Sequence, residues 1–196
     1  MATAETASGE ESSPQTVRLT ASPESGDHRS SVTVGLDEGA DEATTYRAPP
    51  AHFGSTALRI AGNESDVTYM RMVTPSGDSE SAEFDLTLQG EPGSSVTLEA
   101  EDLPTAAGTD LGVMLVEESS GTTHDLRSGS ATVSVPEDGE GTVQLRALLG
   151  AADQLRKQTT PDKLTLEPNY PNPFTEQTTI EYAVPEQTDV TVQVYN

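Results

Sequence analysis

The 196-residue sequence has no cysteine, no tryptophan, only two lysines and no long hydrophobic run. The lack of cysteine excludes a disulfide scaffold and cysteine-ligated zinc sites. Without an apolar run of about 20 residues, the sequence contains no candidate transmembrane helix. Leu, Ile, Val and Phe together number 36, about 18% of the chain. Such a low apolar content combined with high net charge is close to the composition of disordered proteins.

Acidic residues dominate what is present: 33 Asp and Glu stand against 10 Lys and Arg, for a formal net charge of −23. We expect no nucleic-acid partner, because a polyanion without a basic stripe repels phosphate. The acidic residues are spread along the whole chain, and molar salt shortens the Debye length to roughly 3 Å. Dispersed acidity, scarce lysine and many small residues predict a halophilic protein. The alternative is an ordinary acidic extracellular protein.

Period-two alternation of apolar and polar residues recurs too often for a disordered chain. It is found in six segments: Val17-Leu19-Ala21, Val32-Val34-Leu36, Ala82-Phe84-Leu86-Leu88, Val96-Leu98-Ala100, Ala131-Val133-Val135 and Val143-Leu145-Ala147. The run Leu111–Val116 is apolar apart from Gly112, which is typical of a strand buried on both faces. Turn-forming residues separate these segments. The pattern predicts an all-β fold, an antiparallel β-sandwich of immunoglobulin-like or jelly-roll-like type, with about nine strands over 16–149.

The rest of the chain divides into three parts by composition. Residues 1–15 are polar and acidic, and they predict a disordered lead that has neither the basic nor the apolar region of an export signal. Residues 150–163 contain no strand pattern and predict a linker, in which 151–157 could form a short helix. Alternation resumes over 164–196, in Leu164-Leu166, Ile180-Tyr182-Val184 and Val190-Val192-Val194.

A proline- and aromatic-rich motif lies between the first two of these late segments. Its residues are Asn169, Tyr170, Pro171, Asn172, Pro173 and Phe174. The two prolines fix φ near −65° and favour extended geometry in the residues before them. The two aromatic side chains can anchor an irregular lead-in loop on a small sandwich, and the asparagines can satisfy backbone groups. The motif therefore predicts a structural role, not a catalytic one.

This motif and the segments after it closely resemble the start of the C-terminal sorting domain of the type IX secretion system. The same pattern opens the related immunoglobulin-like domain of flagellar hook-capping proteins. Family members often have Gln where Glu167-Pro168 stands here, and Asn-Pro where Thr175-Glu176 stands. The resemblance implies export, with the outer-membrane secretion machinery as partner and the cell surface or medium as destination.

The resemblance covers somewhat less than half of the family's domain, because relatives continue with further strands and a basic tail. Residues 164–196 are therefore expected to be the incomplete, N-terminal part of a sorting domain in a fragment of a longer reading frame. Three strands with open edges are not expected to be stable alone. Residues 16–149 resemble, more loosely, the sandwich that often precedes this domain in surface proteins, which implies a structural spacer.

No residue is predicted to be catalytic, and no metal or cofactor is expected. His28, His52 and His124 are isolated, and they are interpreted as exposed loop residues, as is Asp125 beside four nearby serines. The acidic runs 37–42 and 137–140 do not match an EF-hand loop.

Ligand binding is an alternative role for some of the aromatic positions. Tyr46-Arg47 with His52-Phe53 could border a ligand patch, although covering one end of the sandwich is the favoured interpretation. The sequence thus favours a non-enzymatic secreted protein consisting of a spacer sandwich and a sorting signal. The leading alternative is a sandwich module that binds carbohydrate, calcium or protein. A further alternative is an accessory domain of an upstream hydrolase.

Overall fold

The computed structural model describes residues 13–24, 28–50, 56–62, 67–76, 81–103, 111–137 and 139–159. It also describes 165–166, 178, 182–183, 190–191 and 193. The chain divides into two compact units, Met1–Leu155 and Arg156–Asn196. Nearly all of the predicted acidic lead lies outside the described residues.

Eleven strands of the first unit form one continuous sheet. They are β1 (Gln15–Pro23), β2 (Ser30–Asp37), β3 (Thr44–Arg47), β4 (Ala57–Ala61), β5 (Thr68–Pro75), β6 (Ser81–Gln89), β7 (Ser95–Glu101), β8 (Leu111–Glu117), β9 (Thr123–Asp125), β10 (Ala131–Ser134) and β11 (Thr142–Ala151). The strand order is β10-β7-β1-β2-β5-β4-β6-β11-β8-β9, and β3 pairs with β5 outside this path.

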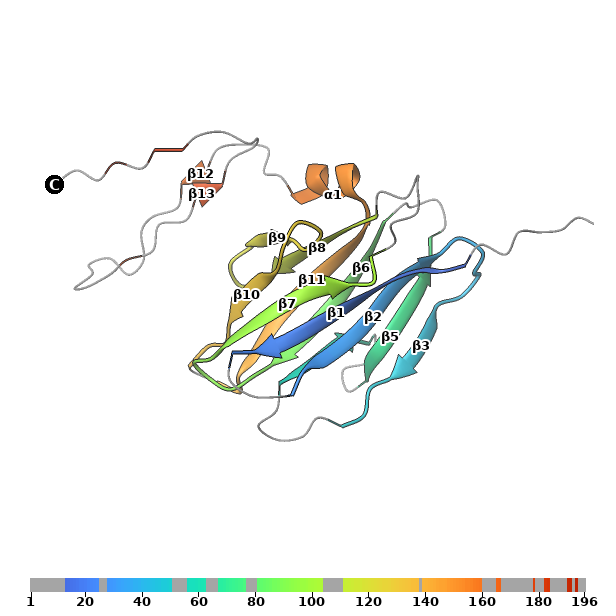
Figure 1. Cartoon of the computed structure of the whole chain (residues 1–196), viewed down its shortest axis with the longest axis horizontal. Coiled ribbons are helices and arrows are strands. Elements are labelled where there is room, and N and C mark those ends of the chain that lie inside the picture. Colours follow the sequence, from blue (N-terminus) through green and yellow to red (C-terminus); the bar gives the residue numbers. More distant parts are fainter. Residues whose placement is uncertain are drawn as a thin grey trace, which may run out of the picture. The chain divides into compact units, whose positions relative to one another are not determined.

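The sheet folds over on itself into a β-sandwich. Figure 1 shows β7, β1, β2, β5 and β3 as one layer, with β6, β11 and β8 behind it. The pairing of β4 with β5 connects the two layers at one side. The hydrophobic core lies between them, because it contains Leu19 and Val34 of the first layer together with Phe84 and Leu145 of the second. The predicted all-β sandwich is confirmed.

Alternation places the core residues as predicted from the sequence. In β6, Phe84, Leu86 and Leu88 are buried, whereas Glu83 and Asp85 on either side of Phe84 are exposed. The same inward-facing pattern is found in β1, β2, β7, β10 and β11. The period of two gives each strand one apolar face, and joining two such faces removes both from water.

One strand pairing differs from the antiparallel prediction. Strands β2 and β5 are parallel, with register Thr33↔Arg71 through Asp37↔Pro75. Parallel neighbours need a crossover connection between them. The chain between β2 and β5 provides it, since this stretch contains β3 and β4.

Strand β8 is buried on both faces, as its apolar run predicts. Leu111, Val113 and Leu115 face the sandwich core, and Met114 packs in a second cluster with Leu148 and Leu155. Leu155 belongs to α1 (Ala152–Thr159), which covers the outer side of β8. Gly112 permits this contact, because a Cβ there would lie 3.0 Å from Cα of Ala152.

The segment 150–163 thus differs from a plain linker over its first part. Gly150 and Ala151 complete β11, in register with Gly112 and Leu111 of β8. The helix that follows begins at Ala152, one residue after the start of the short helix considered from the sequence. The physical reason is that Ala152 and Leu155 bury apolar surface on β8, a contact between residues about 40 positions apart.

The second unit contains one described strand pair. Strands β12 (Thr165–Leu166) and β13 (Tyr182–Ala183) are antiparallel, with Leu166 opposite Tyr182. Both of these side chains are exposed. Strand structure is therefore found within two of the three late alternating segments.

Candidate functional site

The histidine positions show no catalytic arrangement among the described residues. His124 lies on β9, not in an exposed loop as predicted, and its Nε2 is 2.9 Å from Oε1 of Glu117 on β8. Asp125 Oδ1 accepts a hydrogen bond from the Arg127 backbone, and the Ser128 hydroxyl donates to the Asp125 carbonyl. These bonds stabilise the turn after β9. His28 is exposed, and His52 lies outside the described residues.

The acidic runs are similarly used in turns. Asp37 Oδ1 accepts a hydrogen bond from the Gly39 backbone at 2.9 Å, which closes the turn after β2. Within the described ranges, no group of three His, Asp or Glu side chains could hold a metal ion. Asp138 of the second acidic run lies outside those ranges. In addition, none of the described helices is long and apolar enough to cross a membrane.

The ligand patch that the sequence left as an alternative begins on the edge strand β3. Tyr46 is 59% exposed, and Arg47 is also exposed, whereas His52 and Phe53 lie outside the described residues. A further aromatic residue, Tyr69 on β5, is partly buried and packs against the core. Tyr46 pairs with Arg71 and Arg47 with Tyr69, so β5 carries a bulge at this point. Tyr46 and Arg47 consequently line two different hollows.

The first hollow lies on the outer face of the front layer. It has a volume of about 540 Å³ and is lined by Thr33, Thr44, Tyr46, Met70 and Arg71. The registers of β2, β5 and β3 place Thr33, Arg71 and Tyr46 in one row across three strands. Met70 at the bulge is 46% exposed. This outer hollow is thus a shallow, mixed surface of polar, aromatic and thioether groups.

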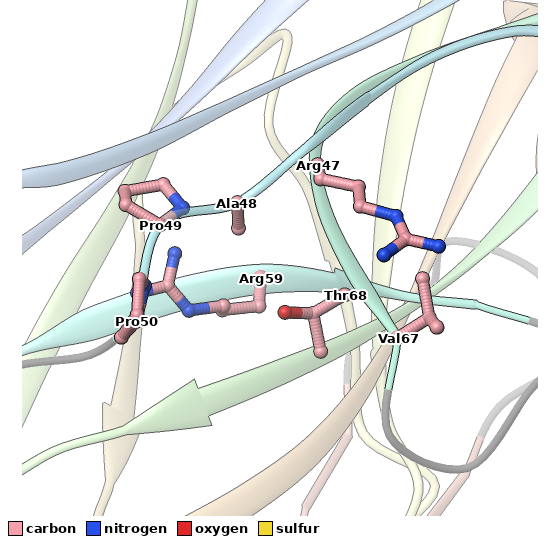
Figure 2. A pocket seen from close by; sticks show the side chains of 7 residues that line it. All are labelled: Arg47, Ala48, Pro49, Pro50, Arg59, Val67 and Thr68. Carbon is pink, nitrogen blue, oxygen red and sulfur yellow. The ribbon is translucent and has the colours of Figure 1, made fainter.

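The second hollow, here called the arginine hollow, lies at the end of β3. It has a volume of about 260 Å³ and is lined by Arg47, Ala48, Pro49, Pro50, Arg59, Val67 and Thr68. The backbone N–H of Ala48 donates to the Thr68 carbonyl at 2.9 Å, which attaches the chain after β3 to the start of β5. Figure 2 shows Arg59 of β4 extending toward Pro49 and Pro50, and Arg47 extending toward Val67.

Two other arginines of the sandwich have acidic partners. Arg146 Nη2 is 2.9 Å from Oε1 of Glu118, and its Nε is 3.7 Å from Oδ1 of Asp85. The hydrogen bond that Arg146 donates to the Glu118 carboxylate raises the pKa of Arg146. Arg18 Nε lies 3.8 Å from Oδ2 of Asp102.

The arginines of the two hollows differ in this respect. No ion pair joins Arg47, Arg59 or Arg71 to another of the described residues. Desolvation by burial lowers the pKa of Arg59. None of the described residues that line either hollow is acidic, in a chain where Asp and Glu outnumber Lys and Arg by 33 to 10.

The sequence alone indicated only some of the residues that line the two hollows. Tyr46 and Arg47 were considered as a ligand patch, but Arg59 and Thr68 were not, because they lie on separate strands that only the tertiary structure brings together. The six motif residues Asn169, Tyr170, Pro171, Asn172, Pro173 and Phe174 lie outside the described residues.

Comparisons with family models, with curated proteins and with solved structures gave no match for this chain.

Proposed function

We propose that this chain belongs to a secreted or cell-surface bacterial protein, in which the sandwich is a spacer and 164–196 contribute to a type IX sorting domain. The observation that carries the proposal is the motif Asn169–Phe174 with the alternating segments that follow it. The motif has two prolines and two aromatic residues in six positions, and no catalytic constellation accompanies it in the sequence.

The division of the chain supports separate roles for its two parts. Residues Arg156–Asn196 form a compact unit of their own. Within it, β12 precedes the motif and β13 follows it, and these strands pair with each other. In the sequence, the motif therefore lies between two strands that pair with each other.

The proposed role is addressing, not chemistry. The sorting domain would be recognised through its folded surface by the outer-membrane secretion machinery, after the protein has crossed the periplasm. The sandwich would hold the exported part away from that machinery. Its extended hydrogen-bonded sheet and large main core suit a spacer, because a small domain with such a core usually unfolds cooperatively.

A secretion assay tests this proposal. The protein, placed behind an inner-membrane export signal, is expressed in a bacterium that has a type IX system and in a strain lacking its outer-membrane machinery. We expect the protein in the medium or on the surface of the first strain, and in the periplasm of the second. Equal surface and medium amounts in both strains would overturn the proposal.

Variants of the motif make the assay specific. We expect Tyr170→Ala combined with Phe174→Ala to leave the protein in the periplasm. Tyr46→Ala, which removes an exposed aromatic side chain from the sandwich, is the matched control and should be exported normally. Retention of the control variant to the same extent would show that the motif has no special part in export.

A further inference from the structure

The arginine hollow is a cationic site in a strongly anionic protein. Arg47 and Arg59 come from different strands and line the same hollow, together with Thr68. Arg18 and Arg146 have acidic ion-pair partners in this chain of net charge −23. In the part of the chain that the structure describes, neither of these arginines has such a partner.

The side chains that line the arginine hollow indicate which kind of ligand it binds. A guanidinium group presents N–H donors in a planar fork that matches the oxygens of a carboxylate, sulfate or phosphate group. The Thr68 hydroxyl can donate one further hydrogen bond. In Figure 2 this hydroxyl points to the side on which the Arg59 side chain extends, whereas Arg47 extends the other way, toward Val67. We propose that the arginine hollow is a binding site for an oxyanion.

The electrostatics of Arg59 agree with this assignment. Its guanidinium is partly desolvated, and this burial lowers its pKa. Removing a charge from water is unfavourable unless an opposite charge or hydrogen-bond acceptors replace the lost solvent. A bound oxyanion supplies both. Arg47 is exposed, and so its side chain is free to rotate toward an anion held by Arg59.

The size of the hollow limits the ligand to a small group. Its volume of about 260 Å³ lies below the range of roughly 300–1,000 Å³ found for pockets that hold drug-sized molecules. Pro49 and Pro50 form part of its wall and contribute no backbone N–H donors. The site therefore fits a free inorganic or organic anion, or one acidic group of an anionic polysaccharide.

This site is independent of the export role and takes up the alternative of a ligand-binding sandwich. The probes are sodium sulfate and sodium acetate as free anions, and trigalacturonate as a saccharide that carries carboxylates. Each is titrated into the protein at low ionic strength, because salt screens the interaction. Arginine Nε–Hε signals are followed by NMR, and affinities are measured by calorimetry.

We expect the signals of Arg47 and Arg59 to shift, and those of Arg146 to stay. The double variant Arg47→Gln and Arg59→Gln should weaken binding at least tenfold. Arg29→Gln, which removes one positive charge where the double variant removes two, is the control, because Arg29 is exposed and lines neither hollow. It should change the affinity by less than threefold. Melting temperatures of all variants verify that they fold.

The possible results distinguish a free anion from an anionic group on a saccharide, and both of these from failure of the proposal. Tighter binding of trigalacturonate than of acetate, by tenfold or more, assigns the site to a saccharide-borne carboxylate. Equal affinities assign it to free anions. If no probe shifts the Arg47 and Arg59 signals, or if Arg29→Gln weakens binding as much as the double variant, the oxyanion site is disproved. None of these results depends on the secretion assay.

Discussion

Strands β6 and β3 belong to the same sheet, yet they have opposite relations to solvent. Strand β6 places Phe84, Leu86 and Leu88 in the core, whereas all residues of β3 are exposed. A central strand is specified by its own alternating pattern, because one face must be apolar. An edge strand is held by its single neighbour, here β5, and its side chains are released from packing. Tyr46 and Arg47, whose side chains are accessible to a ligand, therefore lie at the edge.

The largest expected effect breaks the central strand. Phe84 is 1% exposed, and Phe84→Ala should lower the free energy of unfolding by about 3–5 kcal/mol, since it removes buried surface and leaves a cavity. Tyr46→Ala at the edge should change it by less than about 0.5 kcal/mol. Urea denaturation followed by circular dichroism measures both. Similar losses for the two variants would contradict the distinction between centre and edge.

The next effect concerns a strand that is covered on both faces. Leu155→Ala should cost about 2–4 kcal/mol, because Leu155 of α1 is buried against Met114 and Leu148. The same denaturation experiment measures the loss. An unchanged free energy of unfolding would mean that α1 contributes nothing to the sandwich and that the linker begins at residue 150, as the sequence pattern predicts.

Salt should act on the surface as a whole, with a smaller effect. Raising NaCl to molar concentration screens repulsion among the surface carboxylates of a chain with net charge −23. We expect stabilisation of about 1–2 kcal/mol, which corresponds to a melting temperature raised by about 2–8 °C for a protein of this size. Differential scanning calorimetry measures the shift. A flat response would contradict the halophilic interpretation.

The smallest effect compares a paired arginine with an unpaired one. Arg146→Gln removes the contacts to Glu118 and Asp85 and should cost about 0.5 kcal/mol in low salt, the usual magnitude for a solvent-exposed ion pair. Arg59→Gln should cause no loss, because Arg59 has no ion-pair partner within the described residues and is partly desolvated. A larger loss for Arg59→Gln would show that it has a structural role.

The alternating strands were predictable because their inner face is apolar at every second residue. The sequence pattern identified the strands that contain Leu19, Val34, Phe84, Leu98 and Leu145, and all of these residues are in the core. The pattern missed β3, β4, β5 and β9. These strands are short or lie at edges, and β5 is interrupted by a bulge at Met70. Their periodicity is therefore too weak to distinguish them from loops.

The arginine hollow was predictable only in part, for the same reason. Arg47 was noticed beside Tyr46, but the two side chains line different hollows. Arg59 is 12 positions away in the sequence and lies on a strand that the pattern did not indicate. Strand pairing between β4 and β5, and the hydrogen bond from Ala48 to Thr68, bring these residues to one site.

The sequence by itself determined the all-β class, the inward face of each central strand and the double-sided burial of β8. This was possible because a strand with one buried face needs an apolar residue at every second position, and that pattern is visible in the sequence. Only the tertiary structure decided the parallel pairing of β2 with β5, the docking of α1 and the grouping of Arg47 with Arg59. These features depend on contacts between distant residues, and the spacing of apolar residues along a strand carries no information about its partner.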